Sequence, residues 1–143
     1  MDHIDKQIIT LLKNNSRTTS SEISKNINLS IPAVSERIRK LEESGLIEQY
    51  TVKLNRAKID LNLLAFIHVN VDSQHLSAFR NNIVKFDCVL ECHHIAGESD
   101  YVLKVVVKDT ASLENFITED LKKNLTVSKT NTIIVLSTLK EQL

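Results

Sequence analysis

One segment in the first third of the chain limits the folds that are open to it. Ser30 is followed by a proline in the first helical turn and by apolar residues at helical spacing, and Gly45 ends that pattern. A serine N-cap, an early proline and a terminating glycine are typical of a short, well-defined helix. From 46 to 52 the residues alternate and favour a β-strand. We therefore expect a capped helix that leads straight into a strand.

A second short helix is expected directly upstream. Thr19 and Glu22 have the spacing of a capping box, and Ile23 and Ile27 lie one helical turn apart. Residues 28–30 then form a tight turn. An earlier helix is predicted by an apolar stripe at helical spacing, which consists of Ile4, Ile8, Leu11 and Leu12. Three helices, a tight turn and an exit strand outline a winged helix-turn-helix, a module that places a helix in the major groove of DNA.

The helix after Ser30 carries groups that suit DNA on the face opposite its apolar stripe. Hydrogen-bonding groups near its start suit base edges, and cations further along suit phosphates. The candidate DNA-binding residues are Ser30, Pro32, Ala33, Ser35, Glu36, Arg37, Arg39 and Lys40. A charged helix face is more often merely solvated. The capped helix before it and the strand after it favour the DNA-reading interpretation, with double-stranded DNA as the partner.

The charge is distributed unevenly, although the whole chain has a net charge of zero. Residues 1–58 contain ten Lys/Arg against seven Asp/Glu, whereas residues 59–143 contain eight against eleven. A basic first part suits phosphate, and an acidic second part suits another task. No apolar run approaches the roughly 20 residues of a membrane helix, and the N-terminus has no signal-peptide pattern. We expect a soluble, cytoplasmic and nucleoid-associated protein with free thiols.

The second part of the chain follows a β-α-β-β-α-β order. Strands are expected at 64–71, 89–95, 101–107 and 127–139, with a helical apolar stripe in each of the two longer gaps. This order is that of a ferredoxin-like sandwich, in which two helices cover one face of a four-stranded antiparallel sheet. The predicted fold class is α+β. The predicted division is a DNA-binding domain at 1–52, a linker at 53–62 and the sandwich at 63–143.

The face of that sheet without helices is expected to be apolar. Val102 and Val106 would lie on it, and residues 133–136 are apolar on both faces. Soluble monomers rarely expose a large apolar patch. Face-to-face association of two sheets in a symmetric dimer would cover it. A dimer would also present two DNA-reading helices to two half-sites.

The chain resembles the Lrp/AsnC, or feast/famine, family of bacterial and archaeal transcription regulators. The matching segments are 4–24, 29–55, 95–107 and 130–140. The resemblance implies a winged helix-turn-helix followed by a RAM (regulation of amino-acid metabolism) domain. It implies dimers that assemble into octamers or similar rings, and an amino-acid effector bound between RAM domains. Carried over by position, the effector-binding turn consists of Gly97, Glu98, Ser99 and Asp100.

The chemistry of this turn agrees with that role. A glycine lets backbone N–H groups approach a carboxylate, and an aspartate can hold an α-ammonium group. Many members of the family have an aromatic residue where this chain has Ser99. Two alternatives remain. Gly97 and Asp100 could simply build a β-turn, and the protein could be an architectural DNA-bending or DNA-compacting protein that ignores metabolites.

Metal and enzyme chemistry are weaker interpretations. Cys88, Cys92, His93 and His94 include soft metal ligands, but on a strand the two cysteines would lie about 13 Å apart. One ion cannot bridge that distance. No glycine-rich phosphate loop, nucleophile elbow or paired-carboxylate motif occurs in the sequence. We therefore expect no catalytic activity, no metal and no cofactor.

Overall fold

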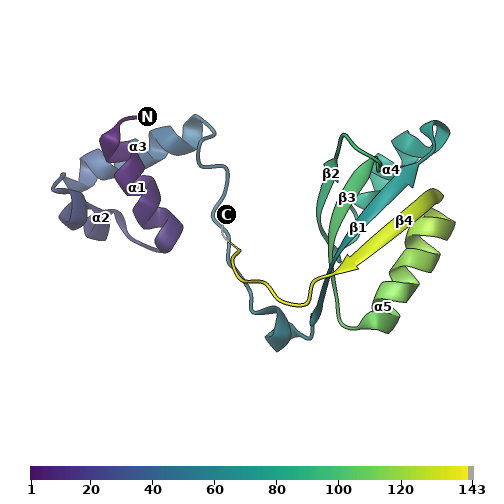
Figure 1. The fold of residues 1–143 in the computed structure, drawn as a ribbon. Coiled ribbons are helices and arrows are strands. Elements are labelled where there is room, and N and C mark those ends of the chain that lie inside the picture. Colours follow the sequence, from purple (N-terminus) through teal and green to yellow (C-terminus); the bar gives the residue numbers. More distant parts are fainter. Residues whose placement is uncertain (142–143) are drawn as a thin grey trace. The chain divides into compact units, whose positions relative to one another are not determined.

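The computed structural model describes residues 1–141 and divides into two units between Leu54 and Asn55 (Figure 1). Each unit has a hydrophobic core of its own. The division falls within 53–62, the segment that the sequence assigns to a linker. No helix within the described residues is both long and apolar enough to cross a bilayer.

The first unit contains three capped helices, as the sequence predicts. They are α1 (His3–Asn14), α2 (Ser20–Ile27) and α3 (Ile31–Glu43). Asp2 and Asp5 form a capping box on α1, and Thr19 forms one with Glu22 on α2. The apolar stripes of the three helices meet in one core, whose innermost residues are Ile8, Ile23 and Val34, each 0% exposed.

Both turns around α3 have the expected backbone. Asn28 adopts a left-handed conformation with φ 53°, which ends α2 and turns the chain toward α3. At the other end Gly45 has φ 73°, a region that favours glycine, and the next two amides donate to the carbonyl of Leu41. The predicted stop of the helix at Gly45 is confirmed.

The predicted wing strand at 46–52 is wrong for the single chain. Residues 46–55 contain no strand, and no other strand exists among residues 1–54. A strand needs a neighbour for its backbone N–H and C=O groups, and alternation alone cannot supply one. Tyr50 instead donates a hydrogen bond of 2.7 Å to Glu42. Val52 and Leu54 remain largely exposed.

The second unit has the predicted β-α-β-β-α-β order, and the predicted fold class is confirmed. After a 3-10 turn, η1 (Arg56–Ile59), come β1 (Leu63–Val71), a second 3-10 turn, η2 (Ser73–His75), α4 (Leu76–Ile83), β2 (Val89–His94), β3 (Tyr101–Val107), α5 (Thr110–Asn115) and β4 (Val127–Ile134). Helix α5 continues as a π-helical segment, η3 (Phe116–Asn124). The strands pair antiparallel in the order β2-β3-β1-β4.

The last strand is shorter than predicted. It ends at Ile134 instead of continuing to 139. Its neighbour is β1, and the pairing stops where β1 begins: Ile134 lies opposite Ala65, and Val135 makes a last bond of 2.9 Å to the carbonyl of Leu64. Beyond that point the apolar sequence has no backbone to pair with.

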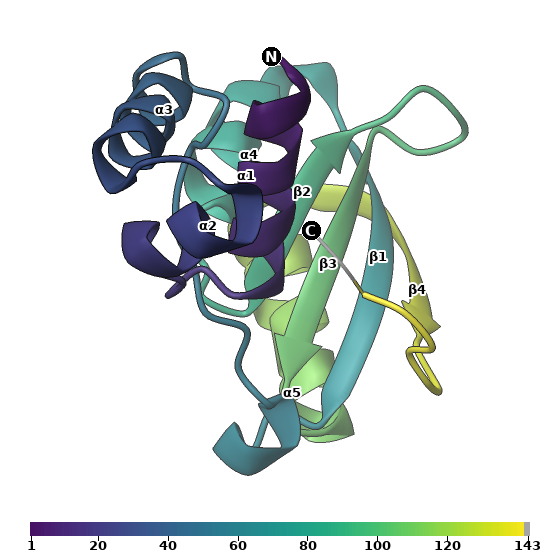
Figure 2. The ribbon, with the colours of Figure 1, turned by 90° about the vertical axis from the view of Figure 1, so that its left-hand side faces the viewer.

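Helices α4 and α5 lie on the same face of the sheet (Figure 2). The inward residues of β1 and β3 alternate and are buried beneath them, together with Phe79 of α4 and Leu121 of η3. The β2–β3 loop, residues 95–100, therefore lies at one end of the strands, beside the last residues of β1.

The other face of the sheet, called here the open face, is less apolar than predicted. Lys104 lies on it between Val102 and Val106, and its ammonium group donates to Glu91 at 3.0 Å and to Glu141 at 2.9 Å. Val106 is only 2% exposed. The expectation of a continuous apolar patch is wrong, because a neutralised cation interrupts it. Ile133 nevertheless remains 50% exposed on this face, opposite Phe66.

Candidate functional site

The outward face of α3 has the exposure that the sequence predicts. Val34 and Leu41 are buried, and Ala33 and Arg37 are half-buried. The exposed candidates are Ser30, Pro32, Ser35, Glu36, Arg39 and Lys40. Ser30 serves as the N-cap, because its hydroxyl accepts from the amide of Ala33 at 3.4 Å.

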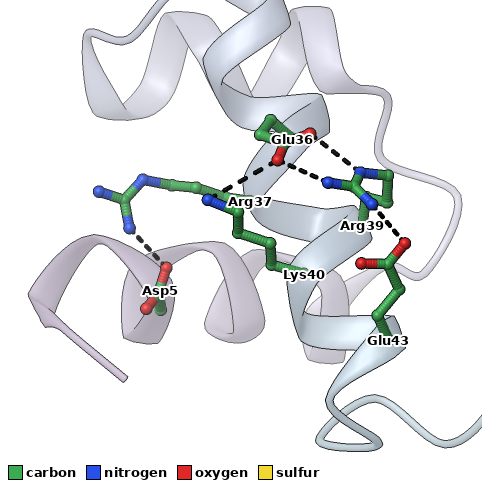
Figure 3. Close-up of polar contacts among 6 residues, drawn as sticks. All are labelled: Asp5, Glu36, Arg37, Arg39, Lys40 and Glu43. Carbon is green, nitrogen blue, oxygen red and sulfur yellow. Dashed lines mark hydrogen bonds and ion pairs between the residues drawn. The ribbon is translucent and has the colours of Figure 1, made fainter.

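Arg39 is held by two carboxylates of its own helix (Figure 3). Its Nε and Nη2 donate to the two oxygens of Glu36 at 2.9 and 2.7 Å, and its Nη1 donates to Glu43. The Nζ of Lys40 lies 3.7 Å from the same Glu36. The hydrogen bond from Arg39 lowers the pKa of Glu36, so this carboxyl group stays ionised. The exposed face of α3 therefore carries cations that are neutralised within the helix.

Arg37 points to α1 instead. Its Nη1 donates to Oδ2 of Asp2 and to Oδ1 of Asp5, at 2.7 Å each, and Figure 3 shows the bond to Asp5. The two aspartates also cap α1 by accepting from each other's backbone amides at 2.9 Å. One pair of carboxylates thus begins α1 and fixes a side chain of α3. Sequence reasoning missed this contact, because the two aspartates lie 35 and 32 residues away from Arg37.

The turn at 97–100 is attached to the end of β1. The Oδ2 of Asp100 accepts from the amide of Val71 at 2.8 Å, and the amide of Asp100 donates to the carbonyl of Val69 at 3.0 Å. Asn70 donates to the carbonyl of Glu98 at 2.9 Å. Asp100 therefore has a structural task, which is to support the irregular register between Asn70 and Val71.

Two features of the turn are not explained by that task. A Cβ at Gly97 would meet no atom within 4 Å, and its φ is not in the left-handed region, so neither packing nor backbone requires a glycine there. The Oδ1 of Asp100 has no hydrogen-bond partner within residues 1–141. Gly97 and Glu98 are exposed, and Ser99 and Asp100 are half-buried.

The cysteine and histidine segment is not assembled as a metal centre. Cys92 lies opposite Leu103 on the helix-covered face, and Cys88 packs against the same core. Burial raises the pKa of both thiols, which disfavours the reactive thiolate. Among residues 1–141, no group of three or more His, Cys, Asp or Glu side chains is placed to hold an ion.

Comparison with known proteins decides the family. A model of winged helix-turn-helix DNA-binding domains matches residues 1–48, and a model of the Lrp/AsnC ligand binding domain matches residues 64–143. This chain belongs to the Lrp/AsnC family. The resemblance that the sequence indicates is confirmed, and this protein is a DNA-binding transcriptional regulator.

Individual relatives of this Lrp/AsnC chain match it along nearly its whole length. The HTH-type transcriptional regulator FL11 of Pyrococcus horikoshii is 37% identical over 142 residues, which cover 99% of this chain and 93% of that relative. The leucine-responsive regulatory protein of Escherichia coli K12 is 31% identical over 144 residues, with coverage of 99% and 88%. A transcriptional regulator from Neisseria meningitidis, solved as a complex with L-Met, has a TM-score of 0.95 at 28% identity, with coverage of 99% and 94%.

Because Arg37 contacts two aspartates, we predict that the stability of the helical unit depends on pH. Hydrogen bonds from backbone amides and from Arg37 lower the pKa values of Asp2 and Asp5. An unfolded aspartate titrates near 3.9, so the stabilisation is complete above about pH 5 and is lost as the pH falls through the lowered values. Asp5→Asn keeps an oxygen for the cap but removes the charge. We expect it to weaken this pH dependence, measured as the urea midpoint of the helical unit from NMR signals of α1 and α3.

The control is Asp72→Asn, which removes an exposed carboxylate that makes no capping hydrogen bond in the second unit. It should leave the pH dependence of α1 and α3 unchanged. Equal acid sensitivity in Asp5→Asn and in the unmodified protein would contradict the assignment.

Proposed function

We propose that α3 is the DNA-reading helix of this regulator and that its exposed face enters the major groove. Ser35 and Glu36 then face base edges, and Arg39 and Lys40 face phosphates. The observation that carries this proposal is the separation of the two faces of α3: a buried stripe anchored on α1 and α2, and an outward face with hydrogen-bonding groups first and cations later.

The ion pairs on α3 do not prevent phosphate binding. Exposed pairs of this kind contribute only about 0–1 kcal/mol, and the side chains of Arg39 and Glu36 are 53% and 48% exposed. A phosphate offers Arg39 the same bidentate geometry in a stronger negative field. Arg39 can therefore exchange its carboxylates for DNA. Arg37 is less free to do so, because two carboxylates of α1 hold it.

We expect Arg39→Ala to weaken binding to operator and random DNA alike. It should reduce the slope of log K against log salt by about 1, because one phosphate contact is lost. Lys108→Ala is the control: it removes one cation from an exposed position just after β3, outside the helical unit, and should leave the slope near its original value. Fluorescence anisotropy over a salt series measures both. Equal slopes in the two variants would contradict the assigned roles.

We propose that the effector is an amino acid bound at the 97–100 turn, between RAM domains of associated subunits. Similar proteins support this: the regulator from Neisseria meningitidis was solved with L-Met, and a feast or famine regulatory protein from Mycobacterium tuberculosis was solved with L-methionine. In this chain the open space at Gly97 and the unpaired Oδ1 of Asp100 suit an α-carboxylate and an α-ammonium group.

Asp100→Asn separates the structural task from binding. The amide oxygen of asparagine can still accept from Val71, but the charge that would hold the α-ammonium group is gone. We expect the variant to fold and to lose about 2 kcal/mol of effector affinity, the contribution of a charged hydrogen bond. Calorimetry with individual amino acids, starting with L-methionine, measures it. If no amino acid binds or alters DNA affinity, the architectural alternative is favoured.

We propose that the protein associates through the open face of the sheet into dimers, and that dimers form an octamer or similar assembly. Ile133 and Leu90 are half exposed on or beside this face. Lys104 is already neutralised by Glu91 and Glu141, so it does not oppose association. Several copies of α3 on one particle would bind DNA at many sites, which suits a protein located on the nucleoid.

We expect light scattering at micromolar concentration to give a dimer or larger particle. Ile133→Lys should reduce the mass of that particle, because association would then bury an unpaired charge. The control is Val84→Lys, which places a lysine at a 71% exposed position just after α4. That variant should keep the original mass. A monomeric unmodified protein would contradict the proposal.

A further inference from the structure

Glu36 is the centre of charge on the exposed face of α3. It accepts both hydrogen bonds that Arg39 makes through Nε and Nη2, and it lies 3.7 Å from Lys40. Glu43 takes the remaining contact of Arg39. These two anions and two cations cancel, so the face that is to meet DNA has no net charge in the free protein.

A carboxylate on such a face is unexpected in contact with DNA. Phosphates line both grooves of DNA and repel an anion that enters a groove. Such an anion is tolerated only where it accepts hydrogen bonds from groups in the groove. Glu36 loses two strong donors when Arg39 turns to a phosphate. In the major groove the base edge that typically donates to a glutamate is the N4 amine of cytosine.

The position of Glu36 fits a contact with a base. It lies in the second turn after the N-cap Ser30, and base edges are contacted by the N-terminal part of a recognition helix. Its side chain is 48% exposed, and its contacts are all with cations that phosphates can attract. Glu43 is the last residue of α3, where a base contact is not expected.

We propose that Glu36 is a specificity-determining residue that accepts a hydrogen bond from the N4 amine of a cytosine after Arg39 has moved to a phosphate. At a cytosine, Glu36 replaces the donors it has lost. At any other base that offers no amine, it remains an unpaired anion in a negative field, and Arg39 is drawn back to it. The ion pair between Glu36 and Arg39 therefore weakens binding to wrong sequences more than binding to the right sequence. This inference rests on the proposed reading of DNA by α3.

The test is selection from a random DNA library with the full-length protein, Glu36→Gln and Glu43→Gln. Both variants remove one carboxylate that contacts Arg39, and both positions are exposed, so folding is not at risk. The unmodified protein should select a motif with a cytosine that Glu36→Gln no longer requires. Because glutamine typically pairs with adenine N6 and N7, the preference at that position should shift toward adenine.

The affinities give a second measurement. For Glu36→Gln the ratio of motif to random-DNA affinity should fall about ten-fold, within the range for one mismatched base pair, because random DNA is bound more tightly. Glu43→Gln should bind both the motif and random DNA more tightly. It should keep the ratio of these two affinities and should still select the cytosine. An unchanged motif in Glu36→Gln, or equal changes in both variants, would overturn the inference and leave α3 as the reading helix. The absence of any motif for the unmodified protein would instead overturn the reading by α3 as well.

Discussion

The ion pair between α3 and the start of α1 is the contact on which the orientation of the proposed DNA-reading face depends. The buried stripe around Val34 sets how deeply α3 packs, but an apolar contact has little directional preference. The bond from Arg37 to Asp2 and Asp5 is directional, and it lies at one edge of that stripe. Because the same carboxylates cap α1, the helix cannot begin elsewhere without releasing α3. The rotation of α3, and therefore which side chains face outward, is thus linked to the first residues of the chain.

Most of the fold could be predicted because its signals are local. Capping residues, the glycine at 45 and the apolar periods lie within a few residues of the elements they specify. The errors all involve partners that are distant in sequence. The predicted strand at 46–52 has no neighbour within its unit, and β4 stops where its partner β1 begins. The alternation along β3 places Lys104 on the open face, but its neutralisation by Glu141, 37 residues away, cannot be predicted from such a local pattern.

The candidate sites show the same limit. The helical period correctly predicts most of the exposed residues of α3, but Ala33 and Arg37 are half-buried. It also cannot say that Arg37 binds carboxylates 32 and 35 residues away. At the turn, residue types indicated both a structural and a binding role for Asp100, and they could not separate them. The bond from Val71 assigns one oxygen to the structure and leaves the other unpaired. A single carboxylate can therefore serve both roles.

If α3 reads DNA from the proposed oligomer, the neutral outward face of this helix affects how the protein finds its DNA sites. If each α3 had free cations, every copy on an oligomer would bind phosphate anywhere, and avidity would multiply that unspecific affinity. With Arg39 held by Glu36 and Glu43, a copy gains phosphate contacts only by releasing those carboxylates. Repetition then multiplies the small difference between right and wrong bases at each site. Weak, self-neutralised helices are therefore better suited to the proposed multivalent assembly than strongly basic ones.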